Sequence, residues 1–207
     1  MNEISKTVLI IDDEPAARSV LKEAFLKCDD FKFEVVAVES AAQADMWLRS
    51  HSADVVTVDL KLGSNTEAGF QWMQRQMLFT SCPDAVKIVV TGYAQRENLL
   101  RAMRLGAWDF VGKDLAYGAQ AVRSAVTRLK ELEEAKRVEG FIFDEWLPEH
   151  EQSLQKEYSG EYVAIDGKGN ILAHGQSMVA LGSALPVEWL ASGRTPFILQ
   201  IAKREAK

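Results

Sequence analysis

The side chains best suited to chemistry in this sequence are three carboxylates, a hydroxyl and an ammonium group: Asp12, Asp13, Asp59, Thr91 and Lys113. Each lies at the end of a short apolar run or directly after one. Because a carboxylate is costly inside a core, we expect these groups to emerge at the carboxyl ends of strands, where open α/β sheets form their ligand crevices.

Three clustered carboxylates repel one another unless a cation lies among them. Carboxylate ligands that leave positions open for water and phosphate favour Mg²⁺. The hydroxyl and the ammonium would then hold the oxygens of a transferred phosphoryl group, and one carboxylate would act as the nucleophile and form an acyl phosphate. The residue types therefore predict phosphoryl chemistry with Mg²⁺.

The elements that must position these residues are five strands alternating with five helices. Strands are predicted at 8–11, 33–38, 53–60, 85–90 and 108–111, and helices at 16–27, 40–48, 70–79, 96–105 and from 117 to about 137. This alternation predicts an α/β fold, a doubly wound five-stranded parallel sheet with helices on both faces. In such a sheet all the carboxyl ends of the strands lie at one edge.

In this order, Asp12-Asp13, Asp59, Thr91-Gly92 and Lys113 resemble the receiver domain of two-component response regulators, over residues 6–130. The resemblance implies a flavodoxin-like fold and a regulatory phosphoacceptor rather than an enzyme. It implies that a sensor histidine kinase or phosphotransfer protein supplies the phosphoryl group and that an unknown downstream protein reads the result. A phosphorylation-independent scaffold with the same fold is the alternative.

The resemblance also implies a role for each residue of the motif. Asp59 would be the phosphoacceptor, Thr91 would bind a phosphoryl oxygen and Lys113 would pair with the phosphate. Thr91 and Phe110 would form the switch, and Mg²⁺ would be held by Asp12, Asp13, Asp59 and the main-chain carbonyl of Lys61. Taken singly, these residues have plainer interpretations: an acidic helix start for Asp12-Asp13, a surface charge for Lys113 and a core aromatic for Phe110.

Three positions depart from the receiver pattern. Lys113 is followed by Asp114 where receivers usually carry a proline, and the loop after Asp59 has Gly63 where a proline is common. Phe110 lacks the hydroxyl of a tyrosine switch. These departures put in question the loop geometry and the phosphoryl lifetime, because none of them removes a reactive group.

The sequence predicts three parts: a receiver at 1–130, a helical connector at 131–157 and a small α+β domain at 158–207. In the last part, a hairpin is expected at 161–165 and 171–173, a helix capped by Ser177 and a final strand at 197–201. Residues 158–167, with the later His174-Gly175, resemble a small bacterial domain of unknown function. Pro148 is expected to start or kink a helix. Dimerisation along the helix that begins at Tyr117 stays open, so a homodimer is one alternative.

Charge and cysteine content restrict the partners. The formal net charge is −6, and residues 140–207 carry six Lys/Arg against nine Asp/Glu, so we expect no DNA binding. Cys28 and Cys82 fit no metal spacing and are interpreted as reduced thiols. The sequence shows no secretion signal and no membrane-spanning stretch, so we expect a cytoplasmic protein without membrane insertion.

Overall fold

The computed structural model describes residues 5–78, 84–192 and 195–203. The chain divides into two compact units, Met1–Glu131 and Leu132–Lys207. Cys82, Pro83 and the predicted helix end at Phe79 lie outside the described residues. The domain boundaries expected at 130 and 157 remain predictions.

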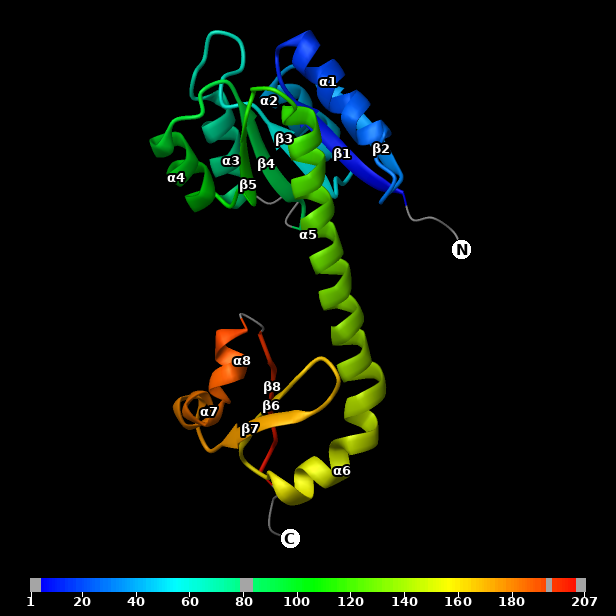
Figure 1. Ribbon diagram of the computed structural model, residues 1–207, viewed down its shortest axis with the longest axis vertical. Helices are drawn as coiled ribbons and strands as arrows, with labels where there is room; N and C mark the ends of the chain where they lie inside the picture. The colour runs from blue at the N-terminus through cyan, green and yellow to red at the C-terminus, as the bar shows by residue number, and fades with distance from the viewer. Residues whose placement is uncertain (1–4, 79–83, 193–194, 204–207) are drawn as a thin grey trace. The chain divides into compact units, whose positions relative to one another are not determined.

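The first unit is a five-stranded parallel sheet, as predicted (Figure 1). Its strands are β1 (Lys6–Ile11), β2 (Phe33–Val38), β3 (Val55–Val58), β4 (Val86–Thr91) and β5 (Asp109–Gly112). Its helices are α1 (Pro15–Leu26), α2 (Ala41–Leu48), α3 (Ala68–Leu78), α4 (Arg96–Arg104) and α5 (Tyr117–Gly140), which runs past the boundary between the units. The strand order is β2-β1-β3-β4-β5, which the alternation of elements alone left open.

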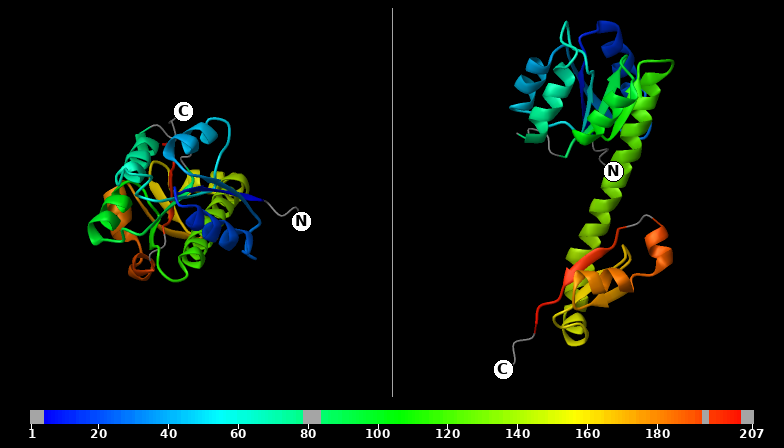
Figure 2. Two further views of the ribbon diagram at one scale, coloured as in Figure 1. Left: turned by 90° about the horizontal axis from the view of Figure 1, so that it is seen from above. Right: turned by 90° about the vertical axis from the view of Figure 1, so that its left-hand side faces the viewer.

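Helices cover both faces of this sheet (Figure 2). On one face, Leu9, Val56 and Val89 of the strands share a core with residues of α2, α3 and α4. The helices α1 and α5 cover the other face and touch each other closely at Gly118, where an added Cβ would lie 3.1 Å from Ala24. The sheet is therefore doubly wound, and its carboxyl edge is left for the polar residues.

Local signals in the sequence account for where several helices begin. Pro15 occupies the first turn of α1, where its missing N–H breaks no helical hydrogen bond. The hydroxyl of Ser40 accepts a hydrogen bond from the Gln43 N–H at the start of α2, as predicted. In α6 (Leu147–Glu157), Pro148 likewise lies in the first turn.

The second unit contains a three-stranded antiparallel sheet of order β7-β6-β8. Its elements are the π-helical turn Phe141–Trp146, α6, β6 (Tyr162–Ile165), β7 (Ile171–Gly175), α7 (Met178–Ala184), α8 (Val187–Ala191) and β8 (Phe197–Gln200). The predicted hairpin, the Ser177 cap and the final strand are all present. The sequence did not predict α8, because five residues are too few for a helical period to be recognised.

The two faces of this small sheet pack against different helices. Val163 and Ile165 contact a cluster that includes Trp146 and Leu154, whereas Ala164 packs on the side of α7. The hairpin turn is held by Asp166, whose carboxylate accepts hydrogen bonds from the main-chain N–H groups of Lys168 and Asn170, both at 2.8 Å. The alternation of side chains along β6 thus gives both faces a core.

No helix in the described part of the chain is both long enough and apolar enough to cross a membrane.

Candidate functional site

Two neighbouring strands bring the carboxylates together. Asp12 follows β1 and Asp59 follows β3, and Ile11 and Val58 are paired in register just before them. The N–H of Asp59 donates to the Ile11 carbonyl at 2.9 Å. Oxygens of Asp12, Asp13 and Asp59 all lie within 4.8 Å of one another.

Two of the three carboxylates are buried, which makes their negative charges costly. Asp12 is 1% exposed and Asp59 is 6% exposed, whereas Asp13 is more open to solvent. Burial raises the pKa of Asp12 above its ordinary value, although Lys113 and the Glu14 N–H oppose that effect. Cationic neighbours are therefore favoured at this edge of the sheet.

Lys113 supplies one positive charge between the two buried carboxylates. Its Nζ lies 2.6 Å from Oδ2 of Asp59, to which it donates a hydrogen bond, and 2.8 Å from Oδ2 of Asp12 in an ion pair. Glu14 is a further neighbour, at 3.6 Å. Burial lowers the pKa of Lys113, but the two carboxylates outweigh it and raise this pKa above the ordinary lysine value.

Main-chain groups orient the remaining carboxylate oxygens. Oδ1 of Asp12 accepts a hydrogen bond from the Glu14 N–H at 3.0 Å, and Oδ1 of Asp59 accepts one from the Lys61 N–H at 3.2 Å. Each of these bonds spans two residues, so the loop after each strand fixes the carboxylate that precedes it. The main chain therefore fixes the orientation of both carboxylates.

The predicted switch residues lie on the two adjacent strands. Thr91 ends β4, is fully buried and accepts a hydrogen bond from the Tyr93 N–H at 3.2 Å. Phe110 is half-buried in β5 opposite Val89 and packs against the core. The Lys113 N–H donates to the Thr91 carbonyl at 2.8 Å, which joins the ends of β4 and β5. The roles assigned to these residues remain predictions.

The loops after Lys113 and Asp59, which depart from the receiver pattern, differ in main-chain conformation. All peptide bonds among the described residues are trans, which includes the bond between Lys113 and Asp114. The chain then turns at Ala116, with φ of 66°. After Asp59, Gly63 adopts φ of 64° inside a tight loop in which Leu62 and Asn65 exchange main-chain hydrogen bonds. Gly63 provides a left-handed conformation that proline could not adopt.

Two residues that position the site, Gly69 and Arg18, were not predicted from the sequence. At Gly69, in the first turn of α3, an added Cβ would lie 2.2 Å from the Asp59 carbonyl oxygen. Arg18 of α1 donates through Nη1 to the Asp12 carbonyl at 2.8 Å. A lone glycine at a helix start was the only sequence signal for Gly69, and Arg18 gave none, because a surface arginine is ordinary on a helix.

The donor set fits a hard divalent cation. It consists of carboxylate oxygens only, and the two buried carboxylates, Asp12 and Asp59, share the single positive charge of Lys113. A further positive charge would offset the remaining negative charge, and Mg²⁺ is the cation that carboxylates with open positions favour. Asp12, Asp13 and Asp59 are thus the residues that could hold a metal ion.

Comparison with known proteins agrees with this geometry. The family model described as the response regulator receiver domain matches residues 8–127. Regulatory protein VirG from Rhizobium rhizogenes is 31% identical over 173 residues, which cover 81% of this chain and 68% of that protein. A protein-glutamate methylesterase/protein-glutamine glutaminase from Burkholderia thailandensis is 34% identical over 125 residues, which cover 58% of this chain and 33% of that protein.

A solved structure shows the same fold. It is a response regulator protein from Burkholderia pseudomallei with a phosphorylated aspartic acid, a calcium ion and citrate. The match has a TM-score of 0.51 at 24% identity and covers 73% of this chain and 85% of that one. Two further VirG proteins are matched over 61% and 64% of their length, so this chain spans only part of these regulators.

Proposed function

The chain belongs to the response regulator receiver family, and from this premise we propose that Asp59 accepts a phosphoryl group and that the chain signals through protein contacts. The observation that carries the proposal is the arrangement of two buried carboxylates, Asp12 and Asp59, around the ammonium of Lys113. Such a cluster is unfavourable unless it serves to bind charge.

In the proposed reaction a carboxylate oxygen of Asp59 attacks the phosphorus of a phosphohistidine on a sensor histidine kinase or phosphotransfer protein. The O–P bond forms as the N–P bond breaks, and the imidazole leaves. Mg²⁺, held by Asp12, Asp13 and Asp59 with the Lys61 carbonyl, would neutralise charge on the phosphoryl oxygens. Lys113 would then pair with one phosphoryl oxygen in place of the Asp59 carboxylate.

The switch would begin at Thr91. Its hydroxyl accepts a hydrogen bond from Tyr93 and so keeps its own proton free to donate. A phosphoryl oxygen on Asp59 would attract that proton and draw Thr91 toward it. Phe110, on the neighbouring strand, would repack as Thr91 moves.

We propose that the output is a protein contact rather than DNA binding or an enzymatic activity of the second unit. Residues 140–207 carry more acidic than basic side chains, which does not suit a phosphate backbone. The α4 surface of the first unit leaves Leu99, Leu100 and Met103 between 36% and 45% exposed, and exposed apolar patches mark interaction sites. The proposal includes a cytoplasmic location, where a kinase could reach the site.

The test is intact mass after incubation with Mg²⁺ and acetyl phosphate. We expect the wild type to gain one phosphoryl group and Asp59→Asn to gain none, because the amide is not a nucleophile. Asp84→Asn, an exposed carboxylate in the same unit, is the matched control and should be labelled as the wild type is. Labelling of Asp59→Asn would refute the assignment.

A scaffold that works without phosphorylation is the second candidate, favoured by the altered loops after Lys113 and Asp59. It predicts no mass gain from any donor. It also predicts equal partner binding with and without Mg²⁺ and beryllofluoride.

A further inference from the structure

The strand β8 of the second unit is an edge strand with an open side. Among the strands that the structure describes, it pairs with β6 alone. The Ile201 N–H donates to the Glu161 carbonyl at 2.9 Å, and hydrogen-bonded residues alternate along an antiparallel pair. The main-chain groups of Ile198 and Gln200 therefore point away from β6, and no described residue from another element hydrogen-bonds to them.

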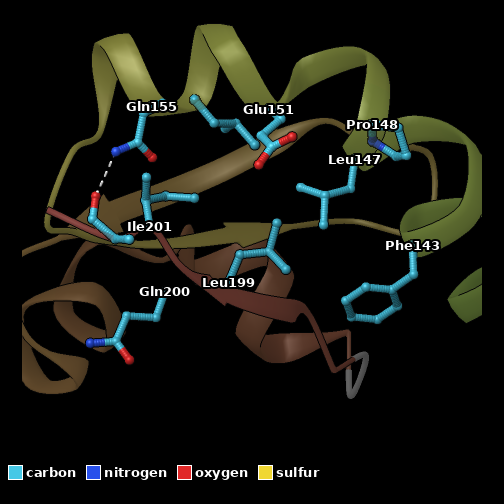
Figure 3. Close-up of a pocket in the computed structure, with 10 residues that line it drawn as sticks. Phe143, Leu147, Pro148, Glu151, Gln155, Leu199, Gln200 and Ile201 are labelled. Atoms are coloured by element: carbon cyan, nitrogen blue, oxygen red, sulfur yellow. Dashed lines mark hydrogen bonds between the residues drawn. The ribbon is translucent and has the colours of Figure 1, made fainter. Parts of the chain in front are cut away.

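After Gln200, the next main-chain carbonyl that points away from β6 is that of Ala202. The carbonyl of Ala202 accepts a hydrogen bond from Nε2 of Gln155, on α6, at 2.8 Å (Figure 3). The helix α6, which packs on one face of the sheet, thus reaches the outer edge of the chain at the end of β8. An open strand edge beside a helix is the kind of groove that binds extended peptides.

The groove between α6 and β8 has a volume of about 400 Å³ and an apolar floor. Figure 3 shows Leu147 of α6 and Phe143 of the preceding turn directed toward Leu199 of β8. Phe143 is 43% exposed, which is unusual for an aromatic residue that lines a core. One apolar side chain of a ligand would cover this surface.

The helical wall of the groove carries one acidic side chain. Of the described residues that line the groove, only Glu151 is charged. The floor strand contributes no charge, because residues 197–202 contain no ionisable side chain. A cationic ligand side chain therefore complements the wall, and Glu151 is the group it would meet.

We propose that this groove binds an extended peptide segment of a partner protein. The segment adds to the sheet as a fourth strand through the main-chain groups of Ile198 and Gln200. It places an apolar side chain on Phe143 and Leu199 and, two residues away on the same face, a Lys or Arg beside Glu151. A second copy of β8 matches the groove less well, because the strand Phe197–Gln200 carries no cation to place beside Glu151 and the next one, Lys203, lies beyond the strand.

The inference rests on the part of the proposed function that gives the second unit a protein-binding role, and not on phosphorylation of Asp59. The two are tested separately, because peptide binding is measured on the unphosphorylated full chain. Asp59→Asn should bind the peptide as the wild type does, whatever the outcome of the labelling experiment.

The probe is the fluorescein-labelled peptide Thr-Leu-Thr-Arg-Thr, followed by fluorescence anisotropy. We expect saturable binding that weakens about tenfold or more when the peptide arginine is replaced by glutamate or when Glu151→Lys is introduced. The glutamate peptide should recover affinity on Glu151→Lys, because the charges are then reversed together. Glu188→Lys, an exposed residue of α8 outside the groove, is the control and should change affinity by less than about twofold.

Hydrogen exchange locates the bound strand. On peptide binding the amides of Ile198 and Gln200 should gain protection, whereas the amide of Leu199 is already bonded to β6. Ile198→Pro removes an outward N–H without touching the β6 ladder, so binding should fall about tenfold or more while circular dichroism stays unchanged.

Three results would overturn the proposal. One is the absence of saturable binding up to about 1 mM peptide. Another is binding without protection at Ile198 and Gln200. The third is a concentration-dependent dimer that Ile198→Pro abolishes, which would assign this edge to a second copy of the chain.

Discussion

The two units handle polar groups in opposite ways. The first unit places the buried charged side chains of the described residues, Asp12 and Asp59, at the carboxyl edge of a sheet covered on both faces. The second unit buries no charged side chain among its described residues and instead leaves main-chain groups open along β8. Charge held in a protected site suits a covalent reaction, whereas an open edge strand suits a reversible contact.

The difference follows from sheet type. A parallel sheet needs crossover helices, which cover its faces and leave the strand ends as the accessible place for ligands. A small antiparallel sheet can be built from a hairpin and one more strand, and one edge then remains unpaired unless another element covers it. In each unit, ligands can reach the part of the sheet that the connections between strands leave uncovered. This part is the strand ends in the first unit and the edge strand β8 in the second.

Two glycine-to-alanine substitutions should each destabilise one unit, and they should cause the largest losses of stability. In Gly69→Ala, the new methyl group would meet the main chain of Asp59 and Leu60, so we expect the first unit to lose about 3 kcal/mol or more of stability. In Gly169→Ala, the methyl group would meet the Trp146 ring, 2.2 Å from Nε1, at φ of 82°. The expected loss there, in the second unit, is about 2 kcal/mol.

Urea unfolding followed by hydrogen exchange assigns each loss, with β1 and β3 amides for the first unit and β6 amides for the second. Gly182→Ala is the control, because nothing lies within 4 Å of its added Cβ and the position is helical. It should leave stability unchanged or raise it by up to about 1 kcal/mol. Equal loss in both units from Gly69→Ala would show that they unfold as one.

Removing the central charge should have the next largest effect. Lys113→Met leaves Asp12 and Asp59 without their shared cation, so we expect a loss of about 2 kcal/mol in the absence of Mg²⁺. Saturating Mg²⁺ should restore part of this loss by supplying a cation to the same carboxylates. Lys156→Met, exposed in the second unit, should change stability by less than about 0.5 kcal/mol in either condition. A loss that Mg²⁺ does not reduce would count against the metal site.

The stability that Lys113 contributes should depend on pH in a defined direction. The pKa of Lys113 is raised above its unfolded value of 10.5, so the folded state holds this proton more tightly. The stability it contributes is complete below pH 10.5 and is lost as the pH rises through the folded pKa. The difference between wild type and Lys113→Met, from urea unfolding, should therefore stay constant from neutral pH to about pH 10 and shrink above it. A difference that fell near neutral pH would contradict the ion pairs.

The smallest effects should be alike in the two units. Ser40 accepts from the Gln43 N–H at 3.3 Å, and Ser177 accepts from the Ala180 N–H at 3.1 Å. Each Ser→Ala change should cost about 1 kcal/mol, and each Ser→Asp change should retain most of the stability. Thermal unfolding resolved by hydrogen exchange would check both, and a much larger loss in one unit would show that its cap does more than begin a helix.

The sequence alone determined what depends on local patterns. The apolar runs and helical periods predicted the five-stranded sheet and the antiparallel hairpin, and residue type at the strand ends predicted the cluster of Asp12, Asp13 and Asp59. Capping by Ser40 and Ser177 and the Asp166 turn were also readable, because each involves neighbours within four residues. Such interactions need no knowledge of the fold.

Which distant groups meet depends on tertiary packing. The strand order, the bridge of Lys113 between Asp12 and Asp59, and the close approach of Gly69 to the Asp59 main chain all join segments that the sequence separates. The groove between α6 and β8 arises in the same way, since its walls are more than 40 residues apart. Distances of this kind are set by how sheets and helices pack, and no local period encodes that packing.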